Sequence, residues 1–311
     1  MCPTPPSVSP SPAPHHFEFD GSASAAPERT SVEVSRVVPG VSETTTRSIL
    51  HIGDNAIIVR HVTQSALYPT PIDRLVFTAT TSRASIFVTK GDQDTLVIDL
   101  NHERYQIKPA SVKQIIEIHT GHEDDTVYVV DRFKNPFHIE TGAGNDSVVS
   151  NAEETTVITG QGNDMVMTGA GNAYVNTGDG NDIVNANGSG TTVAYTGKGA
   201  DFIRAGTGRA FIDAGEGNDV AVGGQGHTVL WGNEGEDLLT AGSGSNVIYA
   251  GKGQDILDGV KGSDKIYTGS DPAFITDGKI DLGETMSPPS SRPNPNIIKV
   301  SSTHLSESGF I

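Results

Sequence analysis

Residues 141–164 read TGAGNDSVVSNAEETTVITGQGND and contain one six-residue pattern twice, with its two copies 18 residues apart. The pattern returns as TGDGND, TGKGAD, AGEGND, GNEGED and AGKGQD, starting at Thr177, Thr196, Ala214, Gly232 and Ala250. The seven copies end at Asp146, Asp164, Asp182, Asp201, Asp219, Asp237 and Asp255, with spacings of 18, 18, 19, 18, 18 and 18. A fixed period over seven units predicts a solenoid built from 18-residue coils.

Each unit divides into two halves of nine residues, and each half combines a tight turn with a short strand. The second halves, such as AGTGRAFID from Ala205, keep the glycines but lack the aspartate. Two strands make one coil, and successive coils stack at the inter-strand distance of about 4.8 Å. The sequence thus predicts an all-β, right-handed parallel β-solenoid with 18-residue coils, in which a bulge near Ala186 absorbs the one extra residue.

The apolar residues of the two halves predict a thin core between two facing stripes. In the first halves the inward positions are Val148, Val166, Val184, Ile203, Ala221, Leu239 and Leu257. In the second halves they are Val157, Val175, Ala194, Ile212, Leu230 and Ile248. Such a coil buries few side chains against the entropy of ordering 18 residues, so we expect a bound cation to contribute to its stability.

The loops contain the donor atoms that calcium prefers. Glycine permits positive φ and lets backbone carbonyls converge, and Ca²⁺ takes six to eight oxygen ligands. Because the coils are 18 residues long, each loop aspartate lies beneath the next, and a cation is expected between the like charges. The candidate ligand residues are the seven aspartates together with Gly142, Gly144, Gly160, Gly162, Gly178, Gly180, Gly197, Gly199, Gly215, Gly217, Gly235, Gly251 and Gly253.

Residues 141–267 resemble the RTX, or hemolysin-type calcium-binding, repeat family, whose nonapeptide is GGxGxDxUx with U a large aliphatic residue. The resemblance implies a parallel β-roll with calcium between successive loops, and here at most six sites along one edge. On the other edge Thr155, Ala173, Thr192, Ala210, Thr228 and Asn246 replace the aspartate, and only Asp264 restores it. We therefore predict one calcium row and an opposite edge largely without metal. DxUx-like segments at Asp94 and Asp125 suggest that degenerate coils extend toward the N-terminus.

The chain divides into four parts by composition. Residues 1–30 form a Pro/Ser-rich leader predicted to be disordered. Residues 31–140 are strand-rich, with Ser111–Ile118 helical in one interpretation. The calcium-binding β-roll spans 141–271, and 272–311 form a tail that caps the last coil or serves as an export signal.

Charge and missing motifs restrict the function. The formal net charge of −17 opposes nucleic acid and anionic membranes as partners and favours a metal or polycationic one. Cys2 is the only cysteine, and the sequence has neither a Sec signal h-region nor a transmembrane stretch. HExxH, GxSxG and P-loop motifs are absent, so we expect no enzyme.

We therefore expect a secreted calcium-binding protein whose solenoid folds when it meets calcium, acting as a bacterial virulence or host-interaction factor. Export would be Sec-independent, through a type I channel or by type III delivery into a host cell, and a host protein or surface ligand is the expected partner. One alternative is an adhesin or partner-binding module on a calcium-stiffened stalk, and a less favoured one is a carbohydrate-active β-helix enzyme. A solenoid without metal, with the aspartates as turn formers, is a further alternative.

Trp231, Tyr249 and Tyr267 align in successive coils and predict an aromatic ladder.

Overall fold

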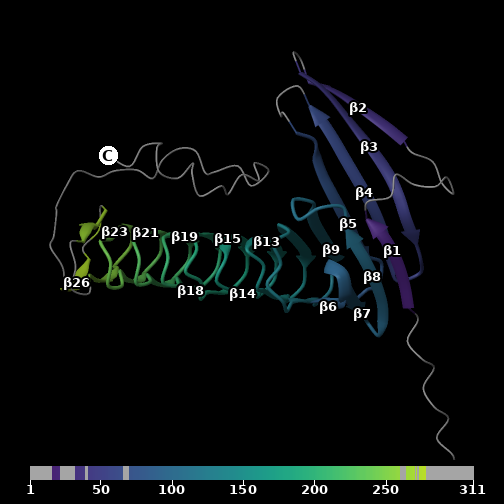
Figure 1. Ribbon diagram of the computed structural model, residues 1–311. Helices are drawn as coiled ribbons and strands as arrows, with labels where there is room; N and C mark the ends of the chain where they lie inside the picture. Colours follow the sequence, from purple (N-terminus) through teal and green to yellow (C-terminus); the bar gives the residue numbers. More distant parts are fainter. Residues whose placement is uncertain are drawn as a thin grey trace, which may run out of the picture.

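The described part of the protein is almost entirely strand and turn. The computed structural model describes residues 16–21, 32–38, 41–65, 70–259, 264–269, 271 and 273–277. These residues form two sheets of 13 strands each, stacked face to face along one axis (Figure 1). The helical part of the described residues is confined to the short 3-10 turn η1 (Asp92–Asp94). No described helix is long and apolar enough to cross a bilayer.

The two sheets are named I and II. Sheet I has the order β1 (His16–Gly21), β8 (Glu103–Pro109), β7 (Leu96–Leu100), β6 (Ser85–Lys90), β10 (Thr126–Val129), β12 (Ser147–Ser150), β14 (Met165–Thr168), β16 (Ile183–Ala186), β18 (Phe202–Arg204), β20 (Val220–Val222), β22 (Leu238–Thr240), β24 (Ile256–Asp258) and β26 (Phe274–Asp277). Sheet II has the order β2 (Val32–Val38), β3 (Val41–Ile52), β4 (Ala56–Ser65), β5 (Ile72–Ala79), β9 (Ile115–Gly121), β11 (Phe137–Ala143), β13 (Glu154–Gln161), β15 (Asn172–Asp179), β17 (Thr192–Tyr195), β19 (Ala210–Glu216), β21 (Thr228–Glu234), β23 (Val247–Lys252) and β25 (Lys265–Tyr267).

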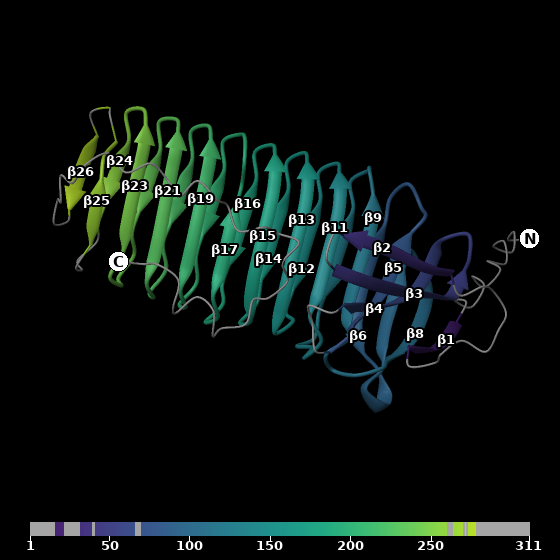
Figure 2. The same cartoon turned by 90° about the horizontal axis from the view of Figure 1, so that it is seen from above.

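From β9 onward the chain alternates between the sheets, and each strand pairs in parallel with the strand one coil earlier. In Figure 2 the arrows of sheet II end at one edge, and the chain returns through sheet I with a right-handed winding. Val148 pairs with Val166 and Val157 with Val175, so the 18-residue period is the coil. The extra residue lies between Ala186 and Thr192, in the loop joining β16 to β17, as predicted for the region near Ala186.

The predicted core is confirmed. The seven inward residues of sheet I, from Val148 to Leu257, are at most 1% exposed, and the six of sheet II, from Val157 to Ile248, are fully buried. They join one continuous cluster that extends into the N-terminal region. On the outer face of sheet II, Trp231 stacks on Tyr249 and Tyr249 on Tyr267, with ring centroids 5.2 and 4.8 Å apart. The predicted aromatic ladder is therefore present and packs on itself.

An antiparallel cap closes the N-terminal end of the solenoid. Strands β2 to β5 form an antiparallel meander that extends sheet II, and β6, β7 and β8 form another that extends sheet I. Figure 1 shows β2, β3 and β4 rising obliquely away from the solenoid axis. Inside the cap the rings of Phe77 and Tyr105 meet edge to face at 5.3 Å, and both side chains are fully buried.

Three expectations for the N-terminal region need correction. Asp94 belongs to η1 in the turn between the antiparallel strands β6 and β7, so it does not start a coil. Residues 111–118 are a turn followed by β9, because Ile116 and Ile118 alternate with the polar Glu117 and His119 at the strand period. Residues 16–21, part of the predicted disordered leader, form β1 along the edge of β8. The sequence HFEFD alternates in the same way, and pairing satisfies backbone groups that the edge strand leaves open.

The C-terminal limit of the solenoid also differs from the prediction. Strand β26 pairs in parallel with β24, so the last coil continues to Asp277 and does not end at residue 271. The remainder of the predicted tail, residues 278–311, lies outside the described residues, as do residues 1–15 and 22–30 of the predicted leader.

Candidate metal centre

The predicted metal-binding aspartates form one continuous ladder along an edge of the solenoid, where the strands of sheet II end in Figure 2. In each loop the backbone N–H of the aspartate donates to Oδ1 of the aspartate one coil later. The donor–acceptor distances are 2.8 Å for Asp146 to Asp164, Asp164 to Asp182, Asp182 to Asp201 and Asp201 to Asp219, 2.9 Å for Asp219 to Asp237 and 3.0 Å for Asp237 to Asp255. The structure therefore brings all seven predicted carboxylates together in register.

The second carboxylate oxygen of each aspartate is buried without a hydrogen-bond partner. This holds for Oδ2 of all seven residues, each of which is at most 2% exposed. Burial raises the pKa of Asp164, Asp201 and Asp219 to about 6 and that of Asp237 to about 7. It raises the pKa of Asp146, Asp182 and Asp255 as well. A buried oxygen of this kind costs free energy unless a proton or a cation satisfies it.

The loop glycines adopt the conformation that the ligand prediction requires. All thirteen candidate glycines have positive φ, and Asn233, which replaces a glycine, adopts φ 75°. A Cβ on Gly162 would lie 1.8 Å from the carbonyl oxygen of Gly144, and one on Gly199 would lie 1.7 Å from that of Gly180. Glycine is therefore required both by the left-handed backbone and by the close stacking of successive loops.

Further hydrogen bonds tie neighbouring loops together. At the fourth loop position the N–H of Gly144 donates to the carbonyl of Gln161, and Gly162 donates to Asp179 in the same way. At the fifth position the direction reverses, because the N–H of Asn163 donates to Oδ1 of Asn145 in the preceding coil. Each boundary between these coils thus has side-chain acceptors on both sides.

Threonine at the first loop position adds a hydroxyl ladder. Oγ1 of Thr159 donates to the carbonyl of Thr177, Thr177 to Thr196, and Thr196 to Ala214, over 3.2, 3.3 and 2.6 Å. The next first positions are Ala214, Gly232 and Ala250, which have no hydroxyl. The N-terminal loops therefore have a metal-independent link that the C-terminal loops lack.

The donor set fits calcium better than a transition metal. Within the described ranges no three His, Cys, Asp or Glu side chains converge on one point, so a cation here would take most of its ligands from backbone carbonyls. Carboxylate and carbonyl oxygens are the hard donors that calcium prefers, and magnesium demands a stricter octahedron. The groups that would hold calcium are Oδ2 of each aspartate and the carbonyl oxygens of the glycine loops.

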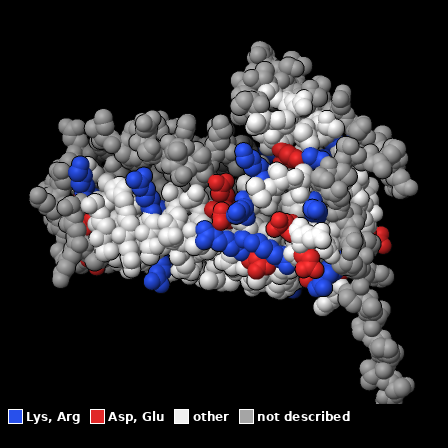
Figure 3. All heavy atoms as spheres, viewed as in Figure 1, with Lys and Arg blue, Asp and Glu red and all other residues white. Residues whose placement is uncertain are grey.

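The opposite edge has few carboxylates. Figure 3 views this edge, where charged side chains gather over the coils next to the cap and become sparse toward the C-terminal end of the solenoid. The residues that replace aspartate there, from Thr155 to Thr228, are buried, and Ser150 Oγ lies 2.8 Å from Thr155 Oγ1. Only in the last described coils does a ladder resume, as the N–H of Thr228 donates to Asn246 Oδ1 and that of Asn246 to Asp264 Oδ1. The prediction of a single calcium row thus stays a prediction, with Asp264 as its one exception.

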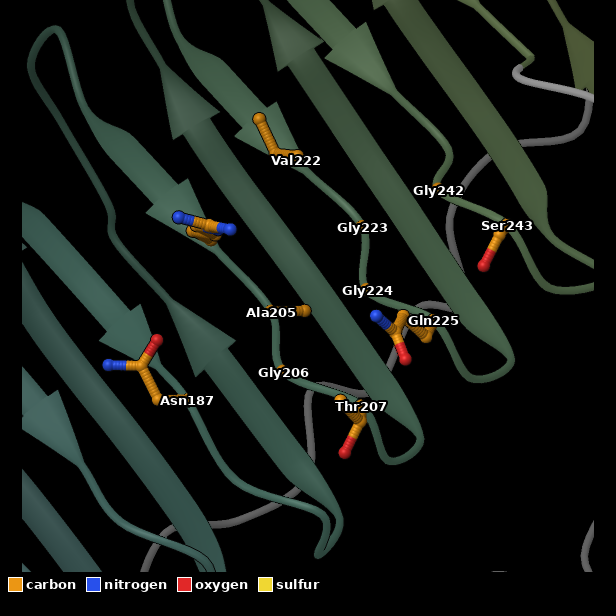
Figure 4. A pocket seen from close by; sticks show the side chains of 11 residues that line it. Asn187, Ala205, Gly206, Thr207, Val222, Gly223, Gly224, Gln225, Gly242 and Ser243 are labelled. Carbon is orange, nitrogen blue, oxygen red and sulfur yellow. The ribbon is translucent and has the colours of Figure 1, made fainter.

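A shallow cavity of about 280 Å³ lies on the same edge (Figure 4). Its wall comes from four successive loops, the first contributing Asn187 and the other three including Gly206, Gly224 and Gly242. Thr207, Gln225 and Ser243 follow these glycines, and Arg204 is the one ionisable residue of the lining. Because these groups include neither a carboxylate nor a histidine, they do not make an acid–base pair.

Sequence reasoning left one member out of the candidate site. Asp125 is 2% exposed, its N–H donates to Asp146 Oδ1 over 2.8 Å, and its Oδ2 is buried without a partner. Its own Oδ1 accepts the N–H of Ala84 at 2.6 Å. The sequence TGHEDD (residues 120–125) could have revealed it. This segment keeps the first glycine of the loop motif, and its last residue, Asp125, lies 21 residues before Asp146. The ladder therefore has eight aspartates.

Comparison with known families agrees with this geometry. Residues 156–193, 195–230 and 231–270 match the family described as RTX calcium-binding nonapeptide repeat (4 copies). This confirms over that segment the family predicted from the loop motif. No curated protein matches the chain.

Proposed function

We propose that this protein is a secreted, non-enzymatic calcium-binding protein of the RTX type whose solenoid becomes ordered when calcium fills the aspartate edge. The observation that carries the proposal is the row of eight buried aspartates, each with one carboxylate oxygen that has no hydrogen-bond partner. Calcium between neighbouring loops would neutralise these oxygens in seven intervals, from Asp125 to Asp255.

The energetic scale suits a folding switch. If each site holds calcium at ten times its dissociation constant, the linkage contributes about 1.4 kcal/mol per site. Over six or seven sites the total is roughly 8 to 10 kcal/mol, comparable with the stability of a whole domain. Where calcium is scarce, the like charges of the ladder favour a loose chain, which suits passage through an export channel.

The test is far-UV circular dichroism and calorimetric titration with calcium, with magnesium as the control. We expect a cooperative gain of β signal and several bound calcium ions, without a comparable response to magnesium. An unchanged spectrum that is already β-rich in chelator, with no heat of calcium binding, would leave the aspartates as turn formers and contradict the proposal.

Export is proposed to be Sec-independent. Deletion of residues 1–30 tests type III delivery, and deletion of residues 280–311 tests a C-terminal type I signal. Each deletion is compared with the intact chain for secretion into the medium or into a host cell. A chain that is exported equally well after both deletions would rule out both routes.

A second function is a calcium-stiffened stalk that presents a host-binding module. It is favoured by the projection of β2, β3 and β4 away from the solenoid, because this arm contributes no strand to the coils (Figure 1). The chain without residues 32–48 loses β2 and most of β3 but keeps β4, whose Ala56 and Ile58 are buried in the core, so it should retain its calcium response but lose binding to host-cell surfaces. Equal binding by the two chains would remove the arm from the interaction.

A further inference from the structure

An apolar stripe runs along the outer face of sheet I. Six of its members directly follow the loop aspartates from Asp164 to Asp255, Phe274 on β26 continues the row, and strand pairing places all of them side by side in successive coils. The members are Met165, Ile183, Phe202, Val220, Leu238, Ile256 and Phe274. All except the partly exposed Val220 are large apolar side chains between 37% and 71% exposed.

The stripe is not a general property of the fold. The same row contains Ser85, Thr126 and Ser147 in the three preceding coils, which are the polar residues expected on a solvated sheet face. From Met165 onward every position is apolar. Isolated apolar residues on a surface are ordinary, but a contiguous exposed row marks an interaction site.

The shape of the stripe is suited to a second copy of itself. Seven residues at about 4.8 Å per coil form a straight row roughly 29 Å long. A twofold axis lying between two copies and parallel to the strands preserves the position along each strand but reverses the order of the coils. Such an axis places the apolar row of one copy on the apolar row of the other in an isologous contact.

The charges beside the stripe and the number of coils in contact together favour one register. The neighbouring outward row contains the cation Arg204 on β18 and two aspartates, Asp258 on β24 and its pairing partner Asp277 on β26. Placing Arg204 opposite Asp258 keeps six coils in contact, one more than placing it opposite Asp277. With the axis between Val220 and Leu238, the coil of Arg204 lies opposite the coil of Asp258 from the other copy. Two Arg204–Asp258 pairs then flank the apolar contact, while Phe202 lies opposite Ile256 and Ile183 opposite Phe274.

We infer that two copies of this protein pack antiparallel through the sheet I stripe, with Arg204 of each copy beside Asp258 of the other. The exposed apolar area is on the order of 500 Å² per copy, which places the pair near the lower limit for a specific interface, about 1,000 Å² in total. The inferred dimer requires only a folded solenoid and is separate from calcium binding. An experiment can therefore disprove the dimer without disproving calcium binding, and the reverse.

The first test measures mass in solution by light scattering on the full chain, in calcium and over a concentration series. We expect a mass of twice 32.6 kDa at high concentration. The variant Ile183→Thr, Phe202→Thr, Leu238→Thr keeps strand-forming residues. It should weaken dimerisation by about 10,000-fold, because burying each side chain is worth about fivefold and the three side chains each occur twice in the dimer. Val112→Thr, at a residue 57% exposed outside the stripe, is the control and should leave the dimer intact.

The second test is charge reversal. Arg204→Asp alone and Asp258→Arg alone should each weaken the dimer by at least about tenfold, and the double variant should restore it. Circular dichroism in calcium verifies that every variant keeps the β signal. A monomeric wild type, a dimer that survives the triple threonine variant, or a double variant no tighter than the single ones would each overturn the inferred arrangement.

Discussion

Asp219→Asn should have opposite effects on stability with and without calcium. The amide keeps the Oδ1 that accepts the N–H of Asp201 over 2.8 Å, but it removes the negative charge of a residue 1% exposed. Burial raises the pKa of Asp219 from 3.8 to about 6, a shift worth roughly 3 kcal/mol at neutral pH. Relaxation of the loop lowers this figure, so in chelator we expect the variant to be about 1 to 3 kcal/mol more stable than the wild type.

In calcium the same change should reduce the stability gained from metal. Asp219 would border two of the proposed sites, one shared with Asp201 and one with Asp237. At ten times the dissociation constant, loss of both lowers the calcium-induced increase in unfolding free energy by about 3 kcal/mol. Urea unfolding followed by circular dichroism, in EDTA and in calcium, measures both quantities. Asp179→Asn is the charge-matched control, since Asp179 is exposed in the loop of Asp182, two coils before Asp219, and its own side chain is not a member of the ladder. Equal calcium increments in wild type and variant would refute the assignment of Asp219 as a ligand.

Other predictions concern glycine, threonine and the N-terminal charges. Gly162→Ala should destabilise the solenoid by more than about 2 kcal/mol, because φ is +126° and a Cβ would meet the Gly144 carbonyl. Gly121→Ala is its control in the same urea assay. A Cβ at Gly121 meets nothing within 4 Å, so this change should cost under about 1 kcal/mol. Thr196→Val should lower the unfolding free energy in chelator by about 0.5 to 1.5 kcal/mol, because it removes the hydrogen bond to the Ala214 carbonyl. Thr207→Val, at an exposed position outside the hydroxyl ladder, is its control. Hydrogen bonds to Glu117 and Glu140 raise the pKa of His119 to about 9. The stability that this network contributes should therefore be complete below pH 6.5 and lost as pH rises through 9. In His119→Gln the midpoint of thermal unfolding should depend less on pH over that range.

The repeat could be predicted from sequence because its two periods act together. The 18-residue spacing placed the aspartates in register, and the alternation within each strand identified inward residues such as Val166 and Ile248, which are fully buried. Each of these signals recurs in every coil, so a local error at one position does not shift the register.

The N-terminal cap could not be predicted in the same way. Alternation marks a strand but does not distinguish a parallel from an antiparallel partner, so the Asp94 segment read as a coil although it forms a hairpin turn. The β1 pairing depends on an edge that exists only after β8 has folded. The ladder of N–H donors to Oδ1 likewise follows from the stacking of coils, which the motif does not specify.

The cap gives the solenoid a direction of assembly. Its hairpins hold β5 and β6 in place, so the first coil has a fixed template, and every later coil contacts only the coil before it and the coil after it. In such a one-dimensional array, an unfilled site at the C-terminal end frays only the last coils. An unfilled site in the middle instead separates the coils that are attached to the cap from the coils beyond it. Calcium near Asp182 and Asp201, where the 19-residue coil interrupts the period, would therefore determine how far order extends from the cap.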